Sequence, residues 1–132
     1  MSLNVLVVDD FLTVRKMIRS ALKNVPDVTI AEADSAFLAW SLLKKNRYDL
    51  LLTDWVMPEM SGLELVQKVR AYPAMAGIRI VMISAESEGE KQAIARRYGV
   101  DGFLTKPFAA DALGREIARL FGTSRATQGS SG

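Results

Sequence analysis

The sequence predicts an α/β fold in which a five-stranded parallel sheet carries helices on both faces, a doubly wound arrangement. Five short apolar runs alternate with five segments of helical periodicity along 132 residues, a length that suits one domain. The first four helical segments each connect two strands, and such crossovers return the chain to the same edge, so the strands run parallel. The runs are apolar almost throughout, which is typical of strands covered on both faces.

The expected strands are short, aliphatic or β-branched, and bounded by polar or turn residues. They cover residues 4–9, 29–33, 50–54, 78–84 and 102–105. None of these runs approaches the length that crosses a membrane, so no membrane association is expected.

The first helix is expected to follow the first strand and to stop before Pro26, which cannot continue a helix. Apolar and basic side chains take opposite faces of this segment. The apolar set is Val14, Ile18, Ala21, Leu22 and Val25, and the basic set is Arg15, Lys16, Arg19 and Lys23. The second helix is expected over residues 35–46, with the Ser35 hydroxyl as its N-cap.

The third helix is expected to begin after Ser61, because Glu64 stands three residues later at the spacing of a capping box. The fourth, over residues 88–98, has few apolar side chains. The fifth, over residues 109–121, ends at Gly122, a residue type typical of the position just past a helix. Residues 123–132 are small and polar, so we expect a disordered tail or linker remnant after a domain over residues 1–122.

Composition excludes several kinds of chemistry. The chain has no Cys and no His, which rules out disulfides, thiolate or imidazole metal ligands and Ser-His-Asp catalysis. The formal net charge of +2 is too balanced to indicate direct nucleic-acid binding. Asp9 and Asp10 interrupt the first apolar stretch, so no signal-peptide pattern opens the chain and a cytoplasmic location is expected.

Polar residues follow four of the five expected strands, and ligands of parallel sheets bind outside the carboxyl ends of strands. These residues are Asp9 and Asp10 after the first strand, Asp54 after the third, Ser84 after the fourth, and Lys106 with Pro107 after the fifth. If the strand order is 2-1-3-4-5, those four ends are adjacent and the side chains converge. Taken singly, Asp9 and Asp10 are more simply helix caps, and Asp54 is equally well the start of a turn.

Charge then narrows the chemistry of such a cluster. Three adjacent carboxylates repel one another unless a cation neutralises them, and oxygen-only ligands suit Mg²⁺, or Mn²⁺. A divalent cation and Lys106 together balance the three negative charges. A phosphoryl group would then meet the metal, the lysine and the Ser84 hydroxyl, so the residues predict phosphoryl transfer.

The segments VLVVDDFLTVR, LLLTDWVMPEMSGLEL, VMISAE and DGFLTKPF resemble the receiver domain of two-component response regulators. The resemblance covers essentially all of residues 3–121, is closest to stand-alone chemotaxis-type regulators, and implies a flavodoxin-like sheet of order 2-1-3-4-5. It implies that Asp54 accepts a phosphoryl group from a histidine kinase or a histidine phosphotransfer domain. The protein would then be a phosphorylation-activated switch, and not an enzyme beyond its self-catalysed phosphorylation and dephosphorylation.

The resemblance also implies the roles of the residues around Asp54. Asp10 matches a direct metal ligand, Asp9 acts on the metal through water, and Val56 offers only its backbone carbonyl. Lys106 matches the lysine that pairs with a phosphoryl oxygen, and Pro107 matches the cis proline that aims it.

Ser84 and Phe103 match the switch pair, which reshapes the face of the fourth helix, fifth strand and fifth helix for a protein target. Phe103 lacks the hydroxyl of the tyrosine familiar at this position, so its inward rotamer is expected to be more populated before phosphorylation. Val56 and Glu86 stand where the family adjusts the lifetime of the acyl phosphate, with an effect of open sign.

The basic residues Arg15, Lys16 and Arg19 are either a solvated face or a docking site for an acidic patch on the kinase.

A Mg²⁺-dependent phosphatase or phosphotransferase with an aspartyl nucleophile is the main alternative function. It is disfavoured because it would place an Asp-x-Asp pattern on the first strand and add a cap domain. A degenerate receiver used only for docking is disfavoured because the acids, the hydroxyl and the lysine are all present. A flavodoxin-like cofactor binder is disfavoured because the loop after the first strand is not rich in Ser and Thr.

Overall fold

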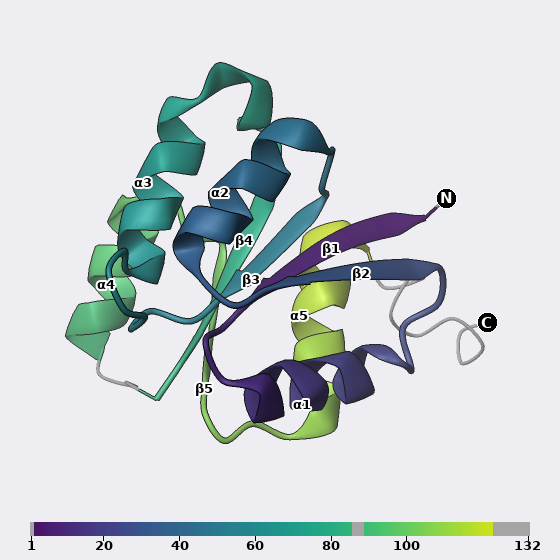
Figure 1. Ribbon diagram of the computed structural model, residues 1–132. Coiled ribbons are helices and arrows are strands. Elements are labelled where there is room, and N and C mark those ends of the chain that lie inside the picture. The colour runs from purple at the N-terminus through teal and green to yellow at the C-terminus, as the bar shows by residue number, and fades with distance from the viewer. Residues whose placement is uncertain (1, 86–88, 123–132) are drawn as a thin grey trace.

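The computed structural model describes residues 2–85 and 89–122, so Glu86 and the expected tail lie outside the described residues. The described strands form one parallel sheet in the order β2-β1-β3-β4-β5 (Figure 1). The strands are β1 (Leu3–Val8), β2 (Val28–Ala33), β3 (Leu50–Thr53), β4 (Arg79–Ser84) and β5 (Gly102–Thr105). The predicted fold class and strand order are confirmed.

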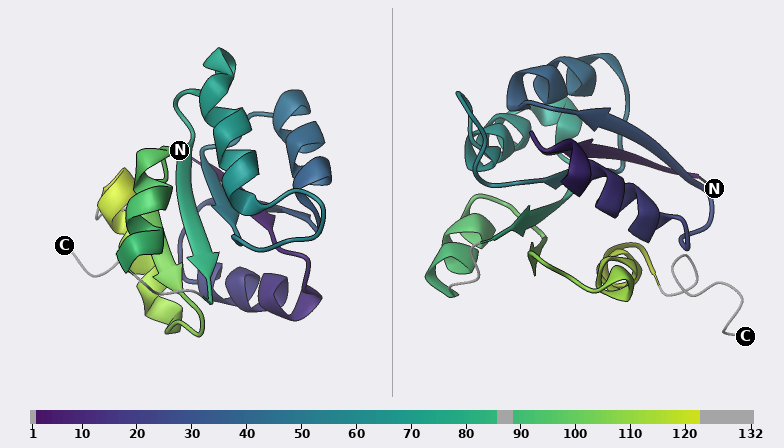
Figure 2. Two further views of the ribbon diagram at one scale, coloured as in Figure 1. Left: turned by 90° about the vertical axis from the view of Figure 1, so that its left-hand side faces the viewer. Right: turned by 60° about the horizontal axis from the view of Figure 1, so that its bottom comes forward.

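Helices cover both faces of the sheet (Figures 1 and 2). In the described part of the chain they are α1 (Leu12–Leu22), α2 (Ala36–Lys45), α3 (Gly62–Ala71), α4 (Gly89–Arg97) and α5 (Ala110–Phe121), with a short 3-10 helix, η1 (Pro73–Met75), before β4. Helices α1 and α5 lie on one face and α2, α3 and α4 on the other. None of the helices described is both long and apolar enough to cross a membrane.

Strand β3 shows how the sheet divides the core into two layers. All four of its residues are buried, and their side chains alternate between the faces. Leu51 packs with the cluster under α2 and α3, whereas Leu50 and Leu52 pack with the cluster under α1 and α5. Each fully buried leucine stabilises the fold by about 1.5–3 kcal/mol. The burial of β3 therefore fixes the position of the residue that follows the strand, Asp54.

The helix ends after β2 and β3 follow the predicted capping pattern. The Ser35 hydroxyl accepts from the Leu38 N–H at 3.1 Å, and the Ser61 hydroxyl accepts from the Glu64 N–H at 3.1 Å. Gly122 ends α5 with a φ of 109°, a conformation that a side chain disfavours. These three helix ends are confirmed.

Helix α1 departs from the expectation at both ends. Phe11 is its N-cap and makes no side-chain capping bond, so the simple interpretation of Asp9 and Asp10 as helix caps is wrong. The Asp9 carboxylate instead accepts the Phe11 N–H at 2.9 Å, which folds the loop before the helix. At the other end α1 stops at Leu22, and Val25 packs into the core beyond it.

Candidate functional site

Asp54 follows the last residue of β3 and leaves the sheet there. Its N–H still donates to the Val8 carbonyl of β1 at 3.0 Å, so its backbone position is set by strand pairing. The residue is only 7% exposed. Trp55 N–H donates to Asp54 Oδ1 at 2.8 Å, and Asp54 Oδ2 lies 3.3 Å from Lys106 Nζ. The backbone therefore holds one carboxylate oxygen while the other faces a cation.

Asp9 and Asp10 follow β1 and differ in how their oxygens are used. Asp9 is 1% exposed, and its carboxylate accepts both the Phe11 N–H and the Lys106 ammonium, the latter at 3.0 Å. Asp10 Oδ1 is buried and has no hydrogen-bond partner among the described residues. A buried carboxylate oxygen without a partner is costly, so Asp10 Oδ1 is the oxygen of this cluster that is open to a ligand.

Lys106 joins the acids from the far side of the site. Its N–H donates to the Ser84 carbonyl at 2.8 Å, which continues the pairing of β4 and β5 beyond their ends. The peptide bond between Lys106 and Pro107 is cis, as the resemblance implies. Ser84 is 1% exposed at the end of β4, in register with Thr105 of β5.

The three carboxylates form one cluster at the carboxyl edge of the sheet. Oxygens of Asp9, Asp10 and Asp54 lie within 4.8 Å of one another, a spacing that one cation can bridge. Burial raises the pKa of Asp54, and the negative charge of Asp9 raises it further, while Lys106 opposes both. The oxygen-only ligands and the unpartnered Asp10 oxygen fit a hard divalent cation such as Mg²⁺.

Trp55 connects this cluster to two other elements. Its ring meets the half-buried Phe103 ring of β5 edge-on, with centroids 6.3 Å apart, and Lys91 Nζ of α4 lies 5.5 Å from the Trp55 ring centroid. The residue next to Asp54 therefore touches both β5 and α4. These contacts were not predicted, because nothing in the spacing of the three residues along the chain indicates that their side chains meet.

Gly62 allows α3 to begin directly against Asp54. The Gly62 N–H donates to the Trp55 carbonyl at 2.8 Å, and a Cβ at this position would lie 1.8 Å from the Asp54 carbonyl oxygen. A side chain does not fit there. Val56, on the same loop, is 66% exposed, and its roles toward metal and acyl phosphate remain predictions.

The basic residues of α1 do not form one uniform exposed face. Arg15 and Arg19 converge on Glu32 of β2, with nitrogen–oxygen distances of 2.9 and 2.7 Å. Arg15 also donates to the Asp9 carbonyl at 2.7 Å, and its side chain is 14% exposed. Burial acts to raise the pKa of Glu32, but hydrogen bonds from Arg19 and Arg15 lower it overall. Lys16 is exposed, and kinase docking remains a prediction.

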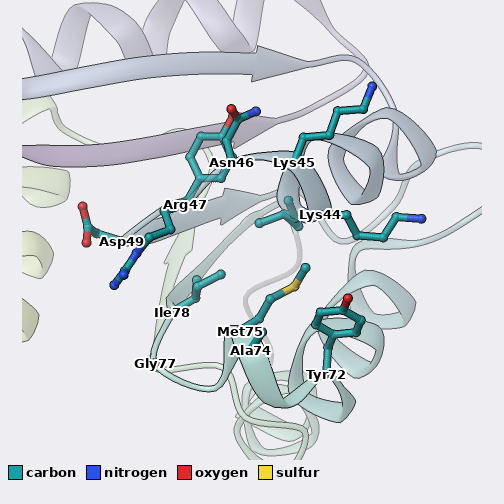
Figure 3. Close-up of a pocket in the computed structure, with 12 residues that line it drawn as sticks. Lys44, Lys45, Asn46, Arg47, Asp49, Tyr72, Ala74, Met75, Gly77 and Ile78 are labelled. Atoms are coloured by element: carbon teal, nitrogen blue, oxygen red, sulfur yellow. The ribbon is translucent and has the colours of Figure 1, made fainter.

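A pocket of about 370 Å³ lies at the opposite end of the sheet, between the end of α2 and η1 (Figure 3). Lys44 and Lys45 border it, but their side chains point outward in Figure 3, and Lys44 Nζ lies 5.6 Å from the Trp40 ring centroid. The two lysines do not converge there as the charged groups do around Asp54, so the acidic cluster is the stronger candidate site.

Comparison with known proteins gives an independent indication of ancestry. Residues 5–118 match the family model described as the response regulator receiver domain. The chain is 35% identical over 119 residues to the chemotaxis protein CheY of Pseudomonas aeruginosa, covering 90% of this chain and 96% of that one. It is 34% identical over 120 residues to the chemotaxis protein CheY-3 of Vibrio cholerae, covering 91% and 92% of the two chains. The structure of the chemotaxis response regulator CheY4 of Vibrio cholerae matches with a TM-score of 0.85 at 29% identity, over 92% of this chain and 100% of that one.

Proposed function

The chain belongs to the response regulator receiver domain family, and we propose that it is a phosphorylation-activated switch of a two-component system, with Asp54 as phosphoacceptor. One observation carries the assignment. Lys106 Nζ lies 3.3 Å from the Asp54 carboxylate and 3.0 Å from that of Asp9, at the edge where the three acids meet. This arrangement supports Asp54 as the nucleophile, because an ammonium group that can bind phosphoryl oxygens lies beside its carboxylate.

In the proposed reaction, an Asp54 carboxylate oxygen attacks the phosphorus of a phosphohistidine on a kinase or phosphotransfer domain. The oxygen–phosphorus bond forms as the nitrogen–phosphorus bond breaks, and the departing imidazole nitrogen takes a proton from water. The product is an aspartyl acyl phosphate. Lys106 then pairs with a phosphoryl oxygen, so its ammonium neutralises charge at the position where Asp54 acquires it.

Asp9, Asp10, Asp54 and the Val56 carbonyl would hold Mg²⁺ or Mn²⁺, which supplies charge neutralisation of the phosphoryl oxygens when bound. The unpartnered Oδ1 supports Asp10 as a direct ligand. Both Asp9 oxygens already accept hydrogen bonds, from the Phe11 N–H and from Lys106, which supports contact through water.

The output of the switch would be a changed face made by α4, β5 and α5, to which a protein target binds. Phe103 lies on β5 and contacts Trp55, so a change beside Asp54 reaches this face through adjacent side chains. Ser84 is proposed to turn toward the phosphoryl group. The two relatives compared above are chemotaxis proteins, so we propose a chemotaxis-type role for this chain, with Arg15, Lys16 and Arg19 toward the kinase.

The test is phosphorylation by a small donor. The protein is incubated with Mg²⁺ and acetyl phosphate, and intact mass and Trp55 fluorescence are followed. We expect an adduct of about 80 Da, the mass of one phosphoryl group. Asp54→Asn should abolish the adduct, whereas Asp34→Asn, at an exposed residue that follows β2, should retain it. An adduct that persists in Asp54→Asn, or none in the wild type, would overturn the assignment.

A further inference from the structure

Arg15 makes two contacts that join different parts of the fold. Its Nε donates to Glu32 Oε1 at 2.9 Å, and its second guanidinium nitrogen donates to the Asp9 carbonyl oxygen at 2.7 Å. That carbonyl belongs to the peptide bond between Asp9 and Asp10. Arg15 therefore holds the peptide plane that links the two residues proposed to face the metal.

The Asp9 backbone is fixed on both sides as a result. Its N–H donates to the Ala33 carbonyl of β2 at 3.2 Å, and its carbonyl accepts from Arg15. The orientation of this peptide plane sets the direction in which the Asp10 side chain leaves the backbone. Asp10 has no hydrogen bond to its buried Oδ1 among the described residues, so the backbone is what aims this oxygen.

Arg15 is itself rigidly placed. Its side chain is 14% exposed, and its partner Glu32 is held at the other carboxylate oxygen by Arg19 at 2.7 Å. A planar guanidinium can span two acceptors in one fixed geometry, which a lysine cannot do.

We propose that Arg15 is a positioning residue of the cation site: it orients the peptide bond between Asp9 and Asp10 so that the Asp10 carboxylate faces the metal. The inference rests on the proposed function, because it concerns the metal of that same site. Groups that orient metal ligands typically change metal affinity about 10–100-fold when removed.

The direction in which Mg²⁺ affinity changes when Arg15 is replaced distinguishes a positioning role from a purely electrostatic effect. A positive charge near the site repels a cation, so removing it should tighten Mg²⁺ binding if electrostatics alone acts. Loss of positioning should instead weaken binding. Arg19→Ala is the matched control, because it removes the same charge from the same helix and the same partner, Glu32, without a contact to Asp9.

The experiment titrates the unphosphorylated full chain with Mg²⁺ alone and follows tryptophan emission, to which Trp55, next to Asp54, and Trp40 both contribute. We expect Arg15→Ala to raise the dissociation constant about 10-fold and Arg19→Ala to change it less than 2-fold. Arg15→Lys keeps the charge but not the planar fork, so we expect it to weaken binding as well, and it serves if Arg15→Ala does not fold. Chemical denaturation of each variant identifies the folded ones.

Equal or tighter Mg²⁺ binding in folded Arg15→Ala or Arg15→Lys would overturn the proposal, as would equal weakening in Arg19→Ala. The wild type distinguishes this from a failure of the proposed function. If the wild type binds Mg²⁺ and forms the Asp54 adduct while the Arg15 variants bind normally, only the positioning role is wrong. If the wild type neither binds Mg²⁺ nor forms the adduct, the proposed function fails and the positioning role with it.

Discussion

Replacing Gly62 by alanine should destabilise the protein strongly, because the position faces backbone. The new Cβ would lie 1.8 Å from the Asp54 carbonyl oxygen, 2.9 Å from its carbonyl carbon and 3.1 Å from the Thr53 hydroxyl oxygen. An ordinary van der Waals contact of a Cβ is 3.4–4 Å, so α3 and the end of β3 must separate by at least about 1.6 Å. Backbone cannot rotate away as a side chain can. We expect the free energy of unfolding to fall by about 3 kcal/mol, the upper end of the usual range for overpacking.

Gly114 offers a matched control within α5, because a Cβ there meets nothing within 4 Å. Gly114→Ala should gain up to about 1 kcal/mol from helix propensity. Urea denaturation of the two variants and the wild type measures both changes. Gly62→Ala should also slow phosphorylation by acetyl phosphate, since the obstructed carbonyl belongs to Asp54. A Gly62→Ala protein as stable as the wild type would refute the close approach of α3 to Asp54.

Three further changes test the electrostatics and the aromatic contact. Asp54→Asn should stabilise the protein without Mg²⁺ by on the order of 1 kcal/mol at pH 7. Burial and the charge of Asp9 raise the pKa of Asp54, so ionisation of this carboxyl group destabilises the folded protein above that pKa. The stabilisation by Asp54→Asn should therefore vanish in acid. A stabilisation that persists in acid would contradict this explanation. Glu32→Gln should lower the free energy of unfolding by about 1 kcal/mol at pH 7, and by progressively less below pH 4.5, the ordinary pKa of a glutamate. The reason is that Glu32, whose pKa is lowered, stabilises the fold only while its carboxylate is ionised. A loss that does not depend on pH would show that packing dominates. Phe103→Tyr should weaken the near-ultraviolet circular dichroism of the Trp55 pair, because a tyrosine hydroxyl favours the outward rotamer; an unchanged spectrum would refute this.

The fold was predictable because local patterns and topology agree. The apolar run ending at Asp54 and the serine caps at Ser35 and Ser61 mark elements that the structure contains. Once the strands are parallel, their carboxyl ends lie at one edge, so the approach of Asp9, Asp10 and Asp54 follows from topology alone. These features depend on position along the chain.

Contacts made by long side chains were not predictable in the same way. Arg15 stands in a basic stripe that reads as a solvated face, yet its guanidinium turns toward Glu32 and the Asp9 carbonyl. The contact of Trp55 with Phe103 depends equally on rotamers and on the placement of β5. Helix α1 begins without a side-chain cap because Asp9 faces Lys106 and the loop N–H, a competition between partners that periodicity does not reveal.

The strand order has a consequence for how the protein behaves in concentrated solution. It leaves β2 and β5 as the two edges of the sheet, where unpaired backbone groups can recruit a strand from another molecule. Strand β5 is only four residues long, which offers little to such a strand. Strand β2 is longer, but it carries Glu32 with two arginines gathered around it. The ion pairs of Glu32 with Arg15 and Arg19 therefore place charged side chains on the longer edge strand, which disfavours its pairing with a strand of another molecule.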